Sequence, residues 1–419
     1  MYEVGKLIKF HRKKKNWSQQ QLARKVNRSI STICKIELGK QQPSKQLLLH
    51  IFQVLNVNRH IKRKRPKLSR QLFTWQKNMT NQQFDVADRY YHHFKQVGIT
   101  DSDDHIELYR LCQFQYALLH YNTEHASKLL PHLIKYTEVF SPQISYPYYK
   151  AISYYFILKQ HFANALTYLN KAVAAHPKQA KKDSDIHLYY AISYYYMNKN
   201  QQATDYVNKA LQLSQNALSP SHMLSSRLFM IINSFTGQVP METNTVTVEL
   251  LNMLEHAKGM NAFFIHYALG KSYVESQDYE SALKYSKINL RQQTSPFLKQ
   301  IALLFCSFVY LLKQETEQAL RLIGSAEEMK LSKALEYEFF ILKAIAQQSY
   351  GSEEFHHKVR KKIIPFFQNT NNIQAIYYCH AILGTANYQK HNYKEAANHY
   401  LIFPGNMYTK ELLNKYPQR

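Results

Sequence analysis

Glycine, proline and cysteine are scarce in this chain of 419 residues, with 10, 12 and 4 copies respectively. A large all-β protein needs more turn-forming glycine and proline, so the shortage favours a helical fold. The four cysteines stand far apart and form no CxxC pair, which argues against a zinc site or a disulfide framework. Free thiols fit a reducing compartment, and we expect a cytoplasmic protein.

Long apolar runs are also lacking. The longest, IALLFCSFVYLL at 301–312, has twelve residues, which is too short to cross a bilayer and is typical of a buried helix. The N-terminus, MYEVGKLIKF, lacks the apolar core of a signal peptide. We therefore expect no membrane partner.

The common catalytic motifs are missing too: the chain has no HExxH, GxSxG, P-loop or GxGxxG sequence. Histidine is frequent, with 20 copies, but the pairs His92-His93 and His356-His357 have no further ligands at metal-binding spacing. We interpret these histidines as surface or packing residues. The sequence predicts neither an enzyme nor a bound metal or cofactor.

Acidic residues are nearly absent from the first seventy positions, which contain 19 Lys/Arg and 2 Asp/Glu. This segment carries +17 of the formal net charge of +25. Such a dense positive charge suits a polyanion, because neutralised phosphates release condensed counterions. A solubilising basic tail is the alternative, but the same segment is strongly patterned.

The pattern is that of short amphipathic helices. Apolar residues recur at helical spacing, and serines stand where helix N-caps are expected. The predicted helices cover residues 4–15, the SQQQLARKV segment from Ser18, the stretch from Ser29 to Gly39, and the segment after Pro43-Ser44. In the third of these, Ile33 and Ile36 are expected to face inward.

The segment WSQQQLARKVNRSISTICKIELGKQQPS resembles the repressor-type (Xre/Cro) helix-turn-helix family, and the resemblance extends over about residues 4–57. The matching positions are Ser18-Gln19, Leu22-Ala23, Ser29, Ile33, Glu37, Gly39 and Pro43-Ser44. Asn27 replaces the usual turn glycine, and asparagine tolerates the left-handed conformation. The resemblance implies a domain over residues 1–58 that binds double-stranded DNA.

In that family the third helix lies in the major groove with its first residues at the base edges. The resemblance implies that Ile30, Ser31 and Lys35 face bases and that Gln19 contacts a phosphate. It also implies a structural ion pair between Arg12 and Glu37, although a surface acid is the alternative for Glu37. The full set expected to contact DNA is Gln19, Arg28, Ser29, Ile30, Ser31, Thr32, Lys35 and Lys40. Only Lys35 among the base-facing residues is a long donor, so we expect modest specificity from one copy and a dimer on a palindromic operator.

The basic segment HIKRKRPKLSR follows and is interpreted as a linker over residues 59–70, with contact to the DNA backbone as the alternative to a solvated hinge. The remaining residues, 71–419, show an internal repeat. YYKAISYYFILKQHFANALTYLNKAVAAHP at 148–177 resembles a tetratricopeptide repeat, with Ala165 at a position where two helices meet closely. Similar segments are centred on Ala87, Ala126, Ala203, Ala282, Ala319 and Ala396, with room for degenerate repeats near 242 and 356.

This register predicts about nine helix pairs of 37–40 residues each. A plain helical bundle is the alternative, but a bundle has no such register. The predicted fold class is all-α, with an N-terminal helix-turn-helix domain followed by a right-handed tetratricopeptide-repeat superhelix.

The two parts together resemble the RRNPP regulators (Rap, Rgg, NprR, PlcR and PrgX), and the length and repeat number are most similar to the NprR branch. The resemblance implies a cytoplasmic transcription regulator whose repeats bind a short signalling peptide, form a homodimer and change the dimer geometry or DNA binding. Two alternatives stay open. One is a scaffold that docks a signalling protein such as a response regulator, and the other is a phage or mobile-element regulator without a peptide ligand.

Candidate peptide-binding residues come from projecting the repeat positions onto the first helix of each pair. Asparagine can donate to and accept from a peptide backbone, and Arg227 and Lys271 could hold a carboxylate. The predicted set is Tyr195, Arg227, Asn233, Asn261, Tyr267, Lys271, Glu275, Asn387 and Tyr388. For each of these residues, a packing role within the repeat is the alternative.

Overall fold

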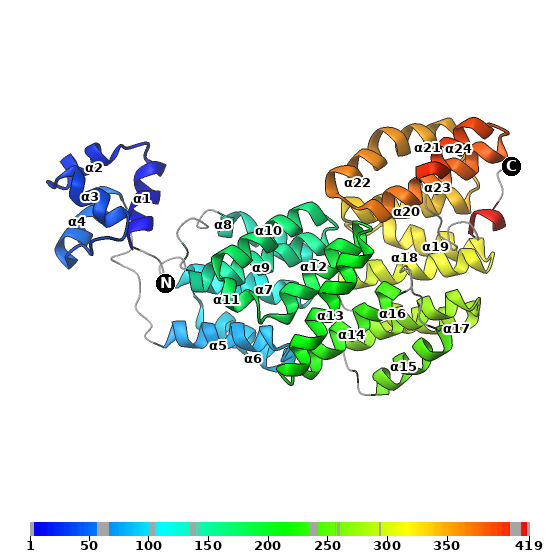
Figure 1. Ribbon diagram of the computed structural model, residues 1–419, viewed down its shortest axis with the longest axis horizontal. Coiled ribbons are helices and arrows are strands. Elements are labelled where there is room, and N and C mark those ends of the chain that lie inside the picture. The colour runs from blue at the N-terminus through cyan, green and yellow to red at the C-terminus, as the bar shows by residue number, and fades with distance from the viewer. Residues whose placement is uncertain are drawn as a thin grey trace. The chain divides into compact units, whose positions relative to one another are not determined.

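The computed structural model describes residues 4–56, 67–99, 105–134, 140, 142–234, 242–255, 257, 260–292, 295–402 and 412–416. Over these residues the protein is built from helices and contains no strand. The all-α class and the order of the two parts, a helix-turn-helix domain and then helical repeats, confirm the prediction (Figure 1). The chain divides into two compact units, residues 1–151 with 170–181 and residues 152–169 with 182–419.

The helix-turn-helix domain consists of four short helices, α1 (Val4–Lys14), α2 (Gln19–Lys25), α3 (Ile30–Glu37) and α4 (Lys45–Val54). Serine hydroxyls cap three of them: Ser18 on α2, Ser29 on α3 and Ser44 on α4. Each hydroxyl accepts a hydrogen bond from a backbone N–H of the first turn that has no partner within the helix. The cap residues therefore fix where the helices begin.

Helix α1 packs directly on α3 because residue 5 has no side chain. A Cβ atom built on Gly5 would lie 1.9 Å from the carbonyl oxygen of Ile36. Behind this contact, Ile33 and Ile36 are buried with Leu7 and Ile8 in one apolar core, which confirms the inward orientation predicted for the two isoleucines. Asn27 has φ 50°, so the residue in the glycine position of the turn adopts the left-handed conformation.

Nine helix pairs follow within the described residues, the number that the repeat register predicts. They are α5 (Leu68–Thr80) with α6 (Phe84–Val97), α7 (Ile106–Leu119) with α8 (Thr123–Ile134), α9 (Pro142–Leu158) with α10 (Phe162–Ala175), α12 (Ser184–Tyr196) with α13 (Asn200–Asn216), α14 (Pro220–Ser234) with α15 (Thr243–Glu255), α16 (Met260–Glu275) with α17 (Tyr279–Gln292), α18 (Pro296–Leu312) with α19 (Thr316–Glu327), α20 (Lys333–Ala346) with the broken helix α21 (Glu353–Lys358), η3 (Val359–Ile363) and α22 (Ile364–Thr370), and α23 (Ile373–Gln389) with α24 (Tyr393–Ile402). A short helix, α11 (Pro177–Ala180), lies between the third and fourth pairs. The array begins at Leu68, so residues 68–70 of the predicted linker are helical, and residues 59–66 lie outside the described residues.

The alanine at the repeat anchor is buried in every clear repeat. Ala87, Ala126, Ala165, Ala203, Ala282, Ala319 and Ala396 all have an exposure of 2% or less. Each lies near the start of the second helix of its pair, where a larger side chain would separate the two helices. The two degenerate repeats predicted near 242 and 356 are the pairs that contain α15 and α21.

A second repeated feature is a left-handed residue five positions before each anchor. These residues are Gln82, Tyr121, Gln160, Asn198, Gln277, Gln314 and His391, with φ between 54° and 63°. The next residue then donates its N–H back to the carbonyl five positions earlier, as His161 does to Phe156 at 2.8 Å. This arrangement ends the first helix of each pair and reverses the chain, and it does so without glycine.

The second unit closes on itself over long sequence distances. Gln374 Nε2, on α23, donates to the backbone carbonyl of Tyr195, on α12, at 2.8 Å. The ring of His161, at the α9–α10 turn, meets Phe366 of α22 at a centroid distance of 5.8 Å. Early and late parts of this unit are therefore in direct contact.

The C-terminal residues 412–416 pack into the core of the last repeats. Leu412 and Leu413 are buried, and the carbonyl of Tyr416 accepts a hydrogen bond from the Tyr350 hydroxyl at 2.6 Å. No repeat signal marks this segment in the sequence, and it covers apolar surface at the end of the array.

Candidate functional site

Helix α3 presents a row of uncharged and basic side chains to solvent. Ile30 is 47% exposed, and Ser31 and Lys35 are exposed as well. Thr32 is half-buried, and its hydroxyl lies 2.8 Å from that of Ser29 while its N–H donates to the same Ser29 oxygen at 3.1 Å. Of the residues expected to contact DNA on this helix, Ile30, Ser31 and Lys35 are thus accessible, whereas Ser29 and Thr32 form its N-terminal cap.

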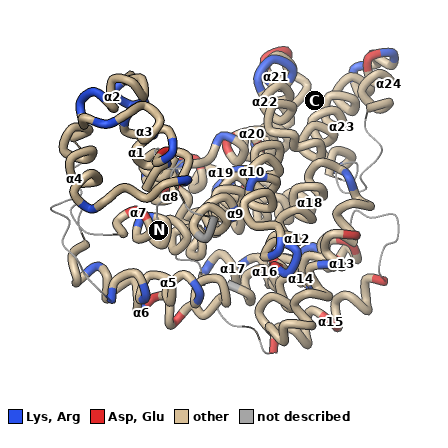
Figure 2. The backbone as a smooth tube through the Cα atoms, turned by 60° about the vertical axis from the view of Figure 1, so that its left-hand side comes forward, with Lys and Arg blue, Asp and Glu red and all other residues tan. Residues whose placement is uncertain are grey.

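The remaining predicted DNA contacts surround this helix. Arg28 and Lys40 are exposed on either side of α3, and Arg28 donates to the carbonyl of Asn27 at 3.1 Å. Figure 2 shows lysine and arginine positions, in blue, along the chain around α2. The only acid among the described residues of this domain is Glu37, and its side chain faces inward, so the exposed surface carries only positive formal charge.

Glu37 joins three helices through a buried ion pair. Arg12 donates from Nε to Oε1 at 2.7 Å and from Nη2 to Oε2 at 2.8 Å, and Glu37 is only 4% exposed. The hydrogen bonds to Glu37 raise the pKa of Arg12 above its usual value, against the opposing effect of burial. Arg12 and Glu37 therefore tie α1 to α3, and Glu37 is not a surface acid.

Gln19 braces this ion pair, and its contact with a phosphate stays a prediction. Its Nε2 atom donates to Glu37 Oε2 at 2.8 Å, so its amide completes the ion pair from the start of α2. The second N–H of this amide and the first-turn backbone N–H groups of α2 are the donors that this position can offer a phosphate.

A second group of polar residues gathers inside the second unit. We call it the interior cluster and define it as Tyr195, Tyr196, Tyr267, Lys271 and Glu338. The Lys271 ammonium lies 5.9 Å from the centre of the Tyr267 ring, and it also acts electrostatically on Tyr195, Tyr196 and Glu275. Four of the predicted peptide-binding residues, Tyr195, Tyr267, Lys271 and Glu275, are thus brought together.

Glu338, on α20, supplies the opposite charge and was missed by the sequence projection. Its Oε1 accepts a hydrogen bond from Gln160 Nε2 at 3.1 Å, and Asn372 Nδ2 donates to the Oε1 of the same Gln160 at 3.0 Å. Burial raises the pKa of Glu338 to about 7, and the bond from Gln160 offsets part of this effect. Both Glu338 and Lys271 act on the phenols of Tyr196 and Tyr267, whose pKa values burial raises, so the two charges share one interior region.

The other predicted peptide-binding residues have partners elsewhere. Arg227 pairs through Nε and Nη2 with the two carboxylate oxygens of Glu249, on α15, so its charge is neutralised within its own helix pair. Asn233 Nδ2 donates to the Thr204 hydroxyl at 3.0 Å. Arg227 is engaged by Glu249 in this arrangement, and its contact with a peptide carboxylate stays a prediction.

The last three candidates do not join the interior cluster by any contact among the described residues. Asn387 Nδ2 donates to the carbonyl of Leu383 in its own helix at 2.8 Å. Tyr388 is 58% exposed, and its ring meets Tyr393 at 5.5 Å. Asn261 is half-buried at the start of α16.

The sequence did contain a signal for Glu338. It lies on the first helix of its pair, as do Tyr195 and Lys271, and it is an acid within the apolar run EYEFFILKAIA. Gln160 could not be found this way, because it is a turn residue whose partner lies 178 positions away.

No helix in the described part of the chain is long and apolar enough to cross a membrane. Within the same residues, histidine, cysteine and acidic side chains form no group of three or more that could hold a metal ion.

Residues 8–60 match the helix-turn-helix family model. The chain is 22% identical over 398 residues to the transcriptional activator NprA of Geobacillus stearothermophilus, a match that covers 89% of this chain and 95% of NprA. Its fold is similar to that of NprR in complex with its cognate peptide NprX, with 16% identity, a TM-score of 0.60 and coverage of 81% and 98% of the two chains.

The apo form of the quorum sensor NprR from B. thuringiensis also matches, with 16% identity, a TM-score of 0.51 and coverage of 83% of this chain and 99% of that one. A Rap protein complexed with Competence and Sporulation Factor matches with 13% identity, a TM-score of 0.57 and coverage of 83% and 99%. Residues 8–60 thus match a helix-turn-helix domain, and the whole chain is similar to the transcriptional activator NprA and shares the fold of the NprR and Rap structures.

Proposed function

We propose that this protein is a cytoplasmic regulator that binds a palindromic DNA operator as a homodimer and whose repeat array responds to a short signalling peptide. The observation that carries the peptide part is the interior cluster. It combines one cation, one carboxylate and three phenols on helices that are far apart in the sequence. The complex of the similar NprR with its cognate peptide NprX gives independent support.

The chemistry of the cluster suits an extended peptide. Lys271 can attract a peptide carboxylate, and Glu338 can accept hydrogen bonds from an ammonium or from backbone N–H groups. The tyrosine rings offer flat apolar faces and hydroxyls at low conformational cost. Among the residues predicted to bind peptide, we retain Tyr195, Tyr267, Lys271 and Glu275, and we add Glu338.

Contacts within the second unit offer a way to couple peptide binding to DNA binding. The bonds Gln160–Glu338 and Gln374–Tyr195 join early residues of this unit to residues of its later helices. A peptide that takes over these donors and acceptors favours an arrangement in which these parts separate. It can regulate the protein only to the extent that it binds one arrangement more tightly than the other.

For the helix-turn-helix domain we propose direct base contacts by Ile30, Ser31 and Lys35, with Arg28 and Lys40 on phosphates. The array is proposed to hold two copies of this domain together, because one α3 helix offers a single long donor to the base edges. Dimerisation through the array doubles the number of base contacts on a palindrome.

The test of peptide sensing is calorimetric titration of the full chain with synthetic peptides encoded by the small reading frame next to its gene. We expect one peptide to bind with saturation and Lys271→Met to weaken it about tenfold or more, because a charge-assisted contact is lost. Lys284→Met is the matched control, since Lys284 also lies over a tyrosine ring, that of Tyr285, at 5.7 Å, but is exposed on α17. Equal losses in the two variants, or no binding by any peptide, would favour a scaffold that docks a signalling protein.

A further inference from the structure

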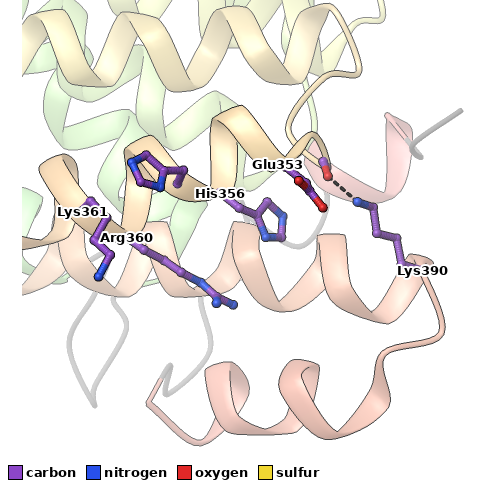
Figure 3. A pocket seen from close by; sticks show the side chains of 7 residues that line it. Glu353, His356, Arg360, Lys361 and Lys390 are labelled. Carbon is purple, nitrogen blue, oxygen red and sulfur yellow. Dashed lines mark hydrogen bonds between the residues drawn. The ribbon is translucent and has the colours of Figure 1, made fainter.

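A cavity of about 370 Å³ lies in the eighth and ninth helix pairs, away from the interior cluster. It is lined by Gly351, Glu353, His356, His357, Arg360, Lys361 and Lys390. Figure 3 labels five of these residues, four on the broken helix α21–η3 and Lys390 at the end of α23. The volume falls in the range of small-molecule sites.

Positive charge dominates the lining. Arg360, Lys361 and Lys390 carry three positive charges, whereas Glu353 is the only acid in the lining. Lys390 Nζ donates to the carbonyl of Gly351 and not to a carboxylate (Figure 3). Among the described acids, Arg360 pairs with the distant Glu395, at 3.8 Å, and both side chains of that pair are about half exposed. The cavity therefore has more cationic charge than its own acid can balance.

An interruption of the regular α-helix determines where two of these cations lie. Residues 359–363 form a π-helical turn, and Pro365 follows it in the first turn of α22. Proline has no N–H, so it cannot donate to the carbonyl of Lys361 four residues earlier, and the regular α-helical ladder cannot continue through this point. The π-helical turn contains both Arg360 and Lys361. Turns of this kind are rare and often occur at functional sites.

The pKa values of the histidines beside this cavity reflect the same excess of positive charge. The Nε2 atom of His356 is buried and has no hydrogen-bond partner among the described residues. Burial, with Arg360 and Lys390 nearby, lowers the pKa of His356. Arg360 Nη2 lies 3.1 Å from Nε2 of His399, and the pKa of His399 is lowered to about 4 by burial and by the neighbouring His380, Arg360 and His356.

We propose that this cavity binds a small oxyanion with at least two negative charges, either a phosphate group or a dicarboxylate. Arg360 matches two oxygens of such a group with its planar fork, while Lys361 and Lys390 act as point charges. His356 Nε2 supplies a further hydrogen bond when it is protonated. This site is independent of the proposed peptide function.

Anion binding at this place is linked to proton uptake. The groups that face His356 are Glu353 on its own helix, Arg360 on η3, Lys390 after α23, and His399 on α24. A bound anion offsets the cations among them and raises the pKa of His356, so binding of a doubly charged anion takes up a proton at this histidine.

The test is calorimetric titration of the full chain with inorganic phosphate and, separately, with succinate, in a chloride-containing amine buffer at pH 7.5, where both probes are mainly doubly charged. We expect saturable binding of at least one probe, with Arg360→Ala and Lys361→Ala each about tenfold weaker, because each removes a charge-assisted contact. Lys362→Ala is the control: Lys362 is the next residue, it is exposed, and it is absent from the lining. It removes the same charge, and we expect less than about a twofold change.

The two probes distinguish a site for a phosphate group from a site for a dicarboxylate. Saturation by phosphate alone assigns a phosphate group, and saturation by succinate alone assigns a dicarboxylate. Binding that does not saturate with either probe, or a loss with Lys362→Ala equal to that with Lys361→Ala, would overturn the proposal. An NMR titration of labelled histidine in the unmodified protein adds a readout that does not rely on any variant folding, because the His356 pKa should rise when the saturating probe is present.

Discussion

Gln160 and Glu338 are 178 residues apart in the sequence, yet Gln160 Nε2 donates to Glu338 Oε1 at 3.1 Å. The donor sits in the left-handed turn of the third helix pair, and the acceptor sits in the first helix of the eighth. The contact places a carboxylate in a region where burial raises its pKa to about 7. It thus links the closing of the second unit to a titratable group.

Stability should fall as the pH rises through the range in which Glu338 ionises. Its pKa is about 7 in the folded protein, whereas the ordinary value for a glutamate is 4.5, so the folded state holds the proton more tightly than the unfolded chain does. The free energy of unfolding therefore decreases between about pH 4.5 and pH 7 and levels off above that range. Glu338→Gln removes this contribution and should be more stable than the parent at pH 8 by about 1–3 kcal/mol. Urea unfolding of both proteins from pH 5 to 8 measures the difference, and a difference independent of pH would contradict the expectation.

Breaking the ion pair in the helix-turn-helix domain should unfold that domain selectively. Arg12→Met leaves the carboxylate of Glu37 buried with only the Gln19 amide as a partner, which costs about 3–5 kcal/mol. Hydrogen exchange of the full chain should show lost protection over residues 4–54 and unchanged protection in the repeats. Lys13→Met, at the exposed neighbouring position, should change stability by less than about 0.5 kcal/mol.

Lys35 should contribute to sequence selectivity more than to general affinity. Lys35→Ala removes the only long donor on the exposed face of α3 and should weaken binding to a selected operator by about 1–3 kcal/mol. Binding to random duplex DNA should change much less, since that affinity comes from phosphate contacts. Fluorescence anisotropy with an operator enriched from a random pool measures both. Lys40→Ala is the comparison and should weaken the two by similar factors.

A glycine at a left-handed turn position should stabilise the array. Gln277 has φ 60° and is exposed between α16 and α17. An L side chain costs about 1–2 kcal/mol in this conformation, and the greater freedom of glycine in the unfolded chain offsets part of the gain. We expect Gln277→Gly to raise the free energy of unfolding by about 0.5–1 kcal/mol. Gln277→Ala keeps a Cβ atom and should bring no gain; a gain equal to that of glycine would rule out the backbone explanation.

Local sequence determined most of the architecture. The serines at positions 18, 29 and 44 and the inward pair Ile33 and Ile36 predicted the helix-turn-helix domain because capping and amphipathic periodicity act within a few residues. The alanine register predicted nine helix pairs because the close approach of two helices requires a small residue at a fixed place in each repeat. Even the degenerate repeats were found by their spacing alone.

Only the tertiary structure decided which polar residues share a site. Tyr195 and Lys271 were predicted from their repeat positions, but Glu338 joins them only because the second unit curves back on itself. Arg227 seemed equally suitable in the sequence, and the structure pairs it with Glu249. The basic cavity around Arg360 also depends on an interrupted helix packed beside α23. Repeat periodicity fixes the face of a helix on which a side chain lies, whereas the partner across the unit depends on the summed rotation of many repeats.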